Sequence, residues 1–346
     1  MNRAIRVGII GCGYATATFH APLVRCVPGL ELRAISSRDA GKVRAACPDA
    51  LAVASPEELL ALPELDLVVI PTPNETHYPL ACQALEAGRH VVVDKPFTIT
   101  LAEAADLRTR AERANRVLSV FHNRRWDSDF LTLKQVLASG ELGRIVHFES
   151  HFDRFRPQVR ERWREQPGPG SGLWYDLGPH LLDQCLQLFG WPEALHLDRA
   201  SQRDGAVVED WFHAVLTYGP MRAILHAGTV VPVPAARFTV HGTRGTFLKE
   251  GLDPQEEALK HGDRPLGEDW GHDPVTARVT TWEGETRNDR LPMCCKGDYP
   301  AYYAAVRDAI LGIHANPVPA EEAMAVMRLL EWGLVSAKEG RTVVPA

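Results

Sequence analysis

Two short motifs carry side chains that could move a proton. Asp94-Lys95-Pro96 follows the apolar run His90 to Val93, and a second motif places Asp176 and His180 four residues apart. A spacing of four is one helical turn, so this carboxylate and imidazole can share one face of a helix. Lysine, carboxylate and imidazole together can act as general acids and bases. Each motif also has an ordinary interpretation, as a solvated lysine or as a helix cap with its partner.

The N-terminus contains a motif that could hold a cofactor beside such groups. The β-branched run Ile5 to Ile10 predicts a buried strand, Gly11-Cys12-Gly13 interrupts it, and apolar positions at helical spacing follow from Ala15 to Val27, with Pro22 as a kink or early stop. A strand, a Gly-x-Gly turn and a helix direct backbone N–H groups at a pyrophosphate. We therefore predict a dinucleotide site whose turn is formed by Gly11, Gly13, Tyr14 and Ala15.

The end of the second predicted strand, Leu30 to Ser36, bears on the choice of cofactor. NAD-binding folds place an acid there, whereas this chain has Ser36-Ser37-Arg38. Two hydroxyls and a guanidinium would hold a 2′-phosphate that a carboxylate would repel. The pattern favours NADP, and NAD remains possible because Asp39 could reach a ribose. The same turn can also be interpreted as a plain cap for a helix from Ala40.

Strands and helices alternate regularly up to residue 122. Buried strands are expected at Leu65 to Ile70, His90 to Val93 and Arg116 to Val120. Such alternation predicts an α/β fold whose first domain, residues 1–122, is a doubly wound parallel sheet.

The pattern changes over residues 123–346, where longer alternating strands predict a C-terminal α+β domain with a large open, mostly antiparallel sheet. Gly251 to Pro274 is predicted to be a long loop. The other predicted elements are strands at Ile145 to Phe155, Trp211 to Tyr218, Arg222 to Val231, Arg237 to His241 and Ala277 to Trp282, and helices at Phe130 to Ser139, Leu177 to Leu188, Pro300 to Leu311 and Glu321 to Ala337. In this interpretation Pro179 lies in the first turn of its helix.

Bulk properties exclude several classes of protein. The length of 346 residues suits about two domains, and a net charge of −6 without a basic run argues against a nucleic-acid partner. No apolar segment approaches the roughly 18 residues of a membrane span. Seven cysteines without a Cys-x-x-Cys or a secretory signal predict reduced thiols in the cytoplasm. His147 and His151 could ligate a metal, but no third ligand stands at a suitable spacing, so no metal is expected.

The chain resembles the glucose–fructose oxidoreductase/inositol dehydrogenase (Gfo/Idh/MocA) family over essentially its whole length. The resemblance rests on Gly11-Cys12-Gly13, the segment Pro71 to His77, Asp94-Lys95-Pro96 (usually Glu-Lys-Pro in the family), Asp176 to His180 and His241 to Gly245. Phe121 to Asp127 and Phe152 to Pro157 resemble a narrower branch that contains NADP-dependent scyllo-inositol dehydrogenases and uncharacterised oxidoreductases.

The resemblance implies a Rossmann domain followed by an open-faced α/β domain. Lys95 would hold the reacting oxygen, His180 would pass the proton and Asp176 would bind or orient the substrate. Further cofactor contacts would come from Pro71, Thr72, Asn74, His77, Asp94, Lys95 and Asn123. Candidates for the substrate pocket are Asn123, Arg125, Arg154, Arg156 and Trp163, although the arginines could instead cross-link the two domains.

The expected function is hydride transfer between NADP and a secondary alcohol or ketone of a cyclitol or sugar, with a scyllo-inositol-like substrate favoured. A glycosidase of the same family, which oxidises its substrate transiently, and a non-catalytic NADP sensor are the alternatives. The simultaneous presence of Lys95, Asp176 and His180 counts against a sensor. Two usable sheet faces predict a homodimer or homotetramer assembled through the C-terminal sheet.

Overall fold

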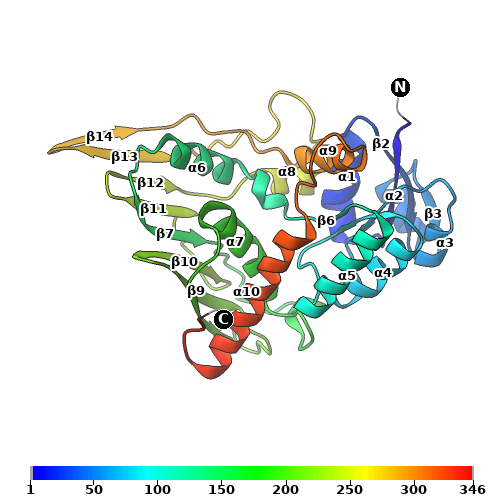
Figure 1. The fold of residues 1–346 in the computed structure, drawn as a ribbon, viewed down its shortest axis with the longest axis horizontal. Coiled ribbons are helices and arrows are strands. Elements are labelled where there is room, and N and C mark those ends of the chain that lie inside the picture. The colour runs from blue at the N-terminus through cyan, green and yellow to red at the C-terminus, as the bar shows by residue number, and fades with distance from the viewer. Residues whose placement is uncertain (1–2, 345–346) are drawn as a thin grey trace. The chain divides into compact units, whose positions relative to one another are not determined.

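A computed structural model describes residues 3–344, which divide into two compact units (Figure 1). The first unit is discontinuous in sequence: it contains the chain up to Trp126, Pro254–Gly271 and Asp298–Ala325. The second unit contains Asp127–Asp253, His272–Gly297 and the chain from Val326. The first unit therefore needs two C-terminal segments beyond the predicted N-terminal domain of residues 1–122.

A parallel sheet with strand order β3-β2-β1-β4-β5-β6 forms the core of the first unit as described. Every residue of β4 is buried, as expected for a strand covered on both faces. The strand order reverses between β1 and β4, where ligands bind in sheets of this kind. The strands are β1 (Ile5–Ile10), β2 (Leu30–Ser36), β3 (Leu51–Val53), β4 (Leu67–Ile70), β5 (His90–Val93) and β6 (Leu118–Val120).

The helices expected from Ala15, Ala40 and Pro300 begin within one residue of those positions. The stretch predicted as one helix from Ala15 is a π-helical turn followed by α1, and Pro22 lies in the first turn of α1, where its missing N–H costs little. The helical elements are η1 (Thr16–His20), α1 (Ala21–Cys26), α2 (Ala40–Ala46), α3 (Pro56–Leu60), η2 (Asn74–Thr76), α4 (His77–Glu86), α5 (Leu101–Ala114), η3 (Asn123–Trp126), α8 (Gln255–His261) and α9 (Tyr299–Ile310).

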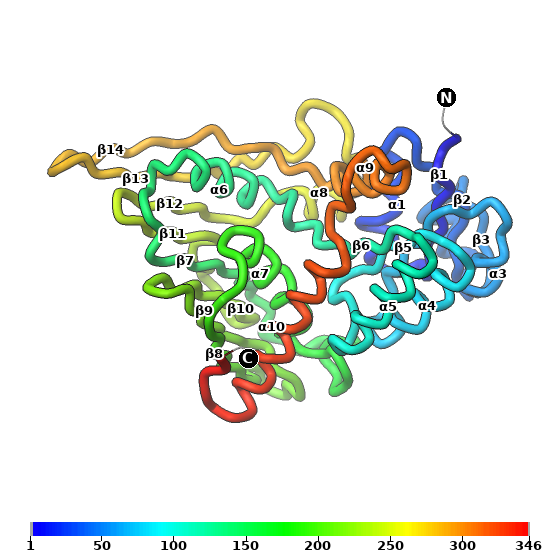
Figure 2. The backbone as a smooth tube through the Cα atoms, viewed as in Figure 1, coloured from blue at the N-terminus to red at the C-terminus, as the bar shows by residue number. Residues whose placement is uncertain are grey.

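In the described part of the second unit, strands pair in the order β14-β13-β12-β11-β7-β10-β9-β8 (Figure 2). All neighbours are antiparallel except β7 and β10, which are parallel. The strands are β7 (Ile145–His151), β8 (Ala194–Ala200), β9 (Trp211–Tyr218), β10 (Met221–Gly228), β11 (Phe238–Gly242), β12 (Gly245–Lys249), β13 (Arg278–Glu283) and β14 (Thr286–Arg290). The helical elements are α6 (Ser128–Ser139), η4 (Trp163–Glu165), α7 (Leu173–Phe189) and α10 (Ala320–Glu339), whose first turns belong to the first unit.

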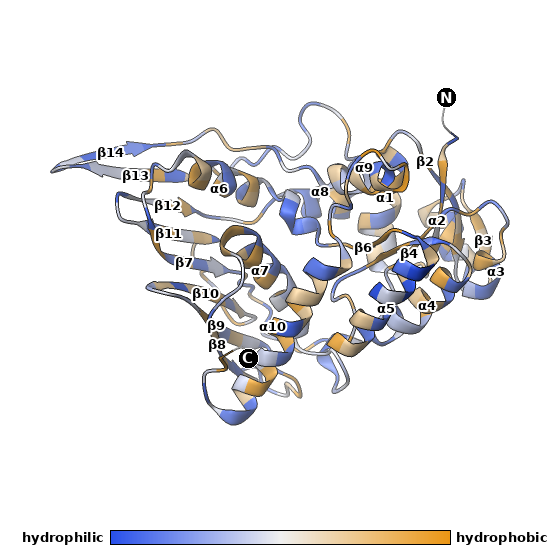
Figure 3. Cartoon of the chain, in the orientation of Figure 1, coloured by the Kyte–Doolittle hydropathy of each residue, from blue (hydrophilic) through white to orange (hydrophobic). Residues whose placement is uncertain are grey.

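The two faces of this sheet have different surroundings. On one face, buried Arg237 joins Ser150 of β7 to Gln184 of α7, with Nη–O distances of 2.6 Å to each side chain. On the opposite face, His147, Glu149 and His151 of β7 remain partly exposed. The outermost strand, β14, is hydrophilic along its length (Figure 3) and all of its residues are exposed.

The structure corrects several predicted boundaries. α7 begins at Leu173, four residues before the prediction, so Pro179 lies in the helix interior. Because Gly172 has φ +87° and a Cβ there would lie 2.3 Å from Glu209, only glycine fits at the residue that precedes α7. The predicted loop from Gly251 contains α8, and the strands β3, β8, β12 and β14 were not predicted. Within residues 3–344, no helix is long and apolar enough to cross a bilayer.

Candidate active site

The glycine turn after β1 is held by two hydrogen bonds and leaves one side open. Gly11 has φ +93°, its N–H donates to the Ser36 carbonyl at 2.9 Å, and Thr16 Oγ1 donates to its carbonyl at 2.8 Å. A Cβ at Gly13 would meet no atom within 4 Å. Backbone N–H groups can therefore approach a pyrophosphate closely at Gly13, and the turn fits a dinucleotide. Tyr14 and Ala15 follow in the same turn, and Tyr14 is exposed.

The loop after β4 lies beside this turn. A Cβ at Gly11 would stand 3.2 Å from Thr72 Cγ2. His77 is fully buried, with Nε2 2.9 Å from the Thr72 carbonyl and Nδ1 2.9 Å from the Pro96 carbonyl. His77 thus ties the loop after β4 to the loop after β5, and burial lowers its pKa. Asn74 is buried in η2.

Asp94 positions the lysine motif at the end of β5. Its Oδ1 accepts the backbone N–H of Lys95 at 2.7 Å, and its Oδ2 lies 3.6 Å from Nε2 of the buried His20. Nδ1 of His20 is 2.6 Å from the hydroxyl of Tyr303 on α9. Burial alone would raise the pKa of Asp94, but His20 and Lys95 lower it to about 2. Asp94 is therefore an anion at neutral pH, and Lys95 is partly buried directly after it.

The turn after β2 exposes a cation. Ser36 is buried and Arg38 is exposed. Oδ1 of Asp39 accepts hydrogen bonds from Gly41 N and Lys42 N at 2.9 and 3.2 Å and caps α2. The capping interpretation of this turn is thus confirmed for Asp39, and it leaves Ser37 and Arg38 outside the cap.

Two of the predicted pocket residues lie in η3 of the first unit. Asn123 and Arg125 are both buried. Arg125 Nη1 contacts Glu322 Oε2 at 2.5 Å and the Pro317 carbonyl at 3.2 Å. Arg125 therefore ties η3 to the first turn of α10 and to the segment before it, all within the first unit, which is a structural use of this guanidinium.

The second unit supplies the carboxylate and the imidazole. Asp176 and His180 are one turn apart on α7, and His180 is only 6% exposed. Asp176 Oδ1 lies 3.4 Å from Nε of Arg164. Lys95 belongs to the first unit, so the described geometry brings Asp176 together with arginines of its own unit.

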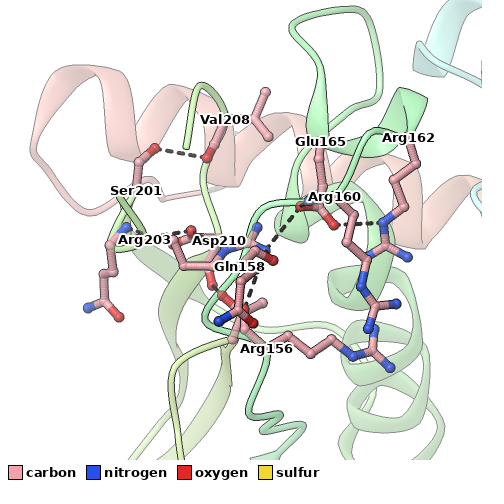
Figure 4. A network of polar contacts seen from close by, with 11 residues as sticks. Arg156, Gln158, Arg160, Arg162, Glu165, Ser201, Arg203, Val208 and Asp210 are labelled. Carbon is pink, nitrogen blue, oxygen red and sulfur yellow. Dashed lines mark hydrogen bonds and ion pairs between the residues drawn. The ribbon is translucent and has the colours of Figure 1, made fainter. Parts of the chain in front are cut away.

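An arginine-rich segment adjoins Asp176. Figure 4 shows Arg156, Arg160 and Arg162 gathered at one side of a polar network. Its centre is the buried Glu165, which pairs with Arg162 at 2.6 Å and with Arg203 at 3.0 Å.

Among the residues described, no side chain forms a hydrogen bond or ion pair with the guanidinium of Arg156. Partial burial, and then the charges of Arg154, Arg160 and Arg162, lower its pKa. The guanidinium of Arg154 lies over the Phe152 ring, and that of Arg164 lies over the exposed ring of Trp163.

Sequence reasoning missed several residues of this region. His20 and Tyr303 support Asp94, and Arg164 pairs with Asp176. His20 and Tyr303 are 283 residues apart, and no local pattern relates them. Arg164 follows the predicted Trp163 directly, so the density of arginines from 154 to 164 was a usable signal.

Comparisons with known proteins match almost the whole chain to oxidoreductases of one family. A family model described as "Oxidoreductase family, NAD-binding Rossmann fold" (GFO_IDH_MocA) matches residues 5–122, and its partner, "Oxidoreductase family, C-terminal alpha/beta domain", matches residues 134–345. The chain is 57% identical over 343 residues to the uncharacterized oxidoreductase YdgJ of Escherichia coli, covering 99% of both chains. It is 38% identical to the scyllo-inositol 2-dehydrogenase (NADP(+)) IolW of Bacillus subtilis, covering 98% of this chain and 96% of IolW.

A solved structure shows the same fold. The oxidoreductase YPO2259 of Yersinia pestis superposes with a TM-score of 0.97 at 52% identity, covering 100% of this chain and 98% of that one. The predicted Rossmann sheet and the predicted open, mostly antiparallel sheet are both confirmed.

Proposed function

The chain belongs to the Gfo/Idh/MocA oxidoreductase family, and from that premise we propose that it is an NADP-dependent dehydrogenase of a cyclitol or sugar. The proposal rests on three side chains that can exchange or bind a proton. Lys95 lies directly after β5, and Asp176 and His180 lie one turn apart on α7. A protein that merely senses a dinucleotide needs only the glycine turn. The proposal requires that Lys95 and His180 act on one substrate.

Each side chain has a defined task in this proposal. When bound, the nicotinamide accepts or supplies the hydride. Nζ of Lys95 donates a hydrogen bond to the reacting oxygen and stabilises negative charge on it. An imidazole nitrogen of His180 takes the hydroxyl proton in oxidation and returns it in reduction, since imidazole titrates near neutral pH. The carboxylate of Asp176 accepts a hydrogen bond from a neighbouring hydroxyl and orients the ring.

NADP is proposed because of the turn after β2. Asp39 is engaged as the cap of α2, so the carboxylate that could have bound a ribose has another role. Exposed Arg38 and the half-buried Ser37 suit a 2′-phosphate, whereas Ser36 is buried. IolW, which is 38% identical to this chain, is by its name an NADP(+) enzyme.

The substrate proposal rests on the chemistry near Asp176. The guanidiniums of Arg154, Arg156 and Arg164 are donors without acceptor capacity, and they suit a ligand rich in hydroxyl or other oxygen acceptors. Trp163 supplies an exposed flat ring beside Arg164, against which one face of a ring-shaped polyol can pack. A cyclitol or sugar meets both requirements, and IolW acts by its name on scyllo-inositol.

The test is a screen of cyclitols, sugars and their keto forms with each nicotinamide cofactor. We expect NADPH formation at 340 nm with at least one secondary alcohol, with kcat/KM higher for NADP than for NAD. Release of an aglycone from a glycoside without net NADPH would indicate the glycosidase alternative. Tight NADP binding without turnover of any polyol or keto-sugar would indicate the sensor.

A cytoplasmic location is also proposed. Within residues 3–344 all seven cysteines are free thiols, which suits a reducing compartment. Labelling of unreduced protein from cells with a thiol reagent tests this: seven reactive thiols after unfolding are expected, and fewer would contradict the proposal.

A further inference from the structure

A row of histidines crosses the partly exposed face of the sheet in the second unit. The parallel register of β10 and β7 places His226 opposite His151, and the antiparallel register of β10 and β9 places His226 opposite His213. Residues opposite one another on neighbouring strands share a face of the sheet. His151 of β7, His226 of β10 and His213 of β9 thus lie side by side on one face of the sheet.

Asp153 joins this row two residues after His151, on the same face of the extended chain. Its Oδ2 lies 3.6 Å from Nδ1 of His151, and its Oδ1 lies 3.6 Å from Nε2 of His226. One ligand atom can be chosen from each of the three residues such that all three atoms lie within 4.8 Å of one another. The rings of His151 and His226 are 5.1 Å apart.

The two distances of 3.6 Å from Asp153 to His151 and His226 are too long for hydrogen bonds. Among the described residues, Nδ1 of His151 and Oδ1 of Asp153 are buried atoms without a hydrogen-bond partner. Nδ1 of His151 faces Oδ2 of Asp153, and Oδ1 of Asp153 faces Nε2 of His226. Buried polar atoms normally have partners, so two orphans that each face another residue of this cluster call for an explanation. Two ligands bound tetrahedrally to an ion at about 2.0–2.1 Å are roughly 3.3 Å apart, close to the observed separation.

The opposite ring nitrogens have the partners that metal-bound histidines require. Nε2 of His151 is 3.2 Å from Oε2 of Glu149, whose other oxygen is 2.8 Å from His147. A ligating histidine usually donates its remaining N–H to a carboxylate in this way. Nδ1 of His226 is 3.4 Å from Nδ1 of His213, so it can donate there while Nε2 keeps its lone pair.

We propose that His151, Asp153 and His226 bind a divalent transition-metal ion of the Zn²⁺ class, with two imidazole nitrogens, one carboxylate oxygen and an open position. Two histidines and a carboxylate are a donor set for such ions, whereas Mg²⁺ and Ca²⁺ prefer oxygen ligands alone. Asp153 and Glu149 supply the negative charge that the cation needs. The site lies within the second unit and does not depend on the proposed hydride transfer.

Titration of chelator-treated full-length protein with Co²⁺ and Zn²⁺ tests the site. We expect one Co²⁺ per chain, with visible d–d absorption that Zn²⁺ abolishes by competition. Asp153→Asn, which keeps the shape of the side chain, and His226→Ala should each weaken binding by about a hundredfold or more. His241→Ala, which removes a histidine of the same face outside the proposed site, should bind as the wild type does.

Thermal melting separates a lost site from a lost fold. Zn²⁺ at a hundred times its dissociation constant should stabilise the wild type, because an ion that binds only folded protein shifts the unfolding equilibrium. The same concentration should leave Asp153→Asn unshifted while that variant retains a cooperative transition. The absence of Co²⁺ and Zn²⁺ binding at submillimolar concentration, or equal binding by the Asp153→Asn variant, would overturn the proposal.

Discussion

Thr72 occupies the space beside Gly11 where the strand order of the parallel sheet reverses. Gly11 follows β1, Thr72 follows β4, and a Cβ at Gly11 would stand 3.2 Å from Thr72 Cγ2. Gly13 differs from Gly11 because no neighbouring atom would lie within 4 Å of a Cβ there. The folded protein itself thus requires glycine at position 11, whereas at position 13 it leaves room for a larger side chain as long as no ligand is bound.

Gly13→Ala should therefore weaken the cofactor without weakening the fold. We expect the melting temperature to stay within about 2 °C of the wild type, since an added methyl group in open space changes unfolding by a few tenths of a kcal/mol. Affinity for NADP should fall at least tenfold because the methyl group enters the space of the pyrophosphate. Gly168→Ala, another glycine with open space, serves as the control. Unchanged NADP affinity in Gly13→Ala would place the pyrophosphate elsewhere.

Arg38→Ala should discriminate between the two nicotinamide cofactors. Losing a charge-assisted contact to the 2′-phosphate costs roughly 1.5–3 kcal/mol, or about ten- to a hundredfold in affinity for NADP. NAD affinity should change little, because NAD lacks that phosphate. Fluorescence titration with NADPH and NADH measures both, with Arg33→Ala, another exposed arginine of this region, as the control. Equal losses for both cofactors would contradict the assignment.

Lys95→Ala and His180→Ala should each lower kcat by about a hundredfold or more, because general acid–base help is worth about a hundred- to ten-thousandfold. Cofactor affinity should fall much less than kcat. The double variant should lose less than the product of the two single effects if the residues act as a unit. Steady-state kinetics on all four proteins measure this, and near-wild-type turnover in His180→Ala would assign the proton to another group.

Acid should destabilise the protein through His90. Burial first, with the charge of Arg116, lowers the pKa of His90 to about 4 in the folded protein, against about 6.5 when it is unfolded. Unfolded chains therefore bind the proton first, so this contribution is complete above pH 6.5 and is lost as the pH falls toward 4. We expect roughly 1–2 kcal/mol, discounted for partial exposure.

His90→Asn tests this contribution. The amide oxygen can still accept the N–H of Val117, as Nδ1 of His90 does at 2.9 Å, but it does not titrate. Urea denaturation at several pH values should show a shallower loss of stability in His90→Asn than in the wild type. His314→Asn, at an exposed histidine, should follow the wild type. Identical pH profiles for wild type and His90→Asn would show that His90 is not responsible.

A homodimer or homotetramer is expected from the partly exposed sheet face. Val215, Ile224 and Leu248 lie on that face and are only half-buried. Apolar residues of this kind suit a symmetric contact between two copies. Light scattering after gel filtration should give two or four chains at micromolar concentration, and Ile224→Glu should lower that number. Val207→Glu, at an exposed loop valine, is the control, and a monomeric wild type would contradict the expectation.

Local patterns predicted the strands with strong alternation, and the strand Trp211–Tyr218 has the predicted bounds. Local patterns failed to predict elements whose existence or bounds depend on tertiary contacts. β14 is entirely polar, and it is a strand only because β13 pairs with it. Pro179 indicated a helix start, but α7 continues through it because the segment from Leu173 to Tyr175 is buried as helix.

The candidate site was predictable only as a set of isolated motifs. Lys95, Asp176 and the glycine turn each have a local signature. His226 of the proposed metal site has no such signature, because it stands 75 residues after His151 and the register of two parallel strands sets their proximity. No third ligand was recognised in the sequence at a suitable spacing from His147 and His151, because spacing along the chain does not show which residues the sheet brings together.

The discontinuity of the first unit has a consequence during synthesis. Phe121 packs against Tyr302 and Tyr303 at ring separations of 5.0 and 5.9 Å, and Tyr303 also contacts His20 behind Asp94. About 170 residues separate Trp126 from Asp298, where the unit resumes. The glycine turn and Asp94-Lys95-Pro96 therefore leave the ribosome long before Tyr302 and Tyr303. The first unit therefore reaches its final form only after the segment Asp298–Ala325 has emerged, when most of the second unit has already been synthesised.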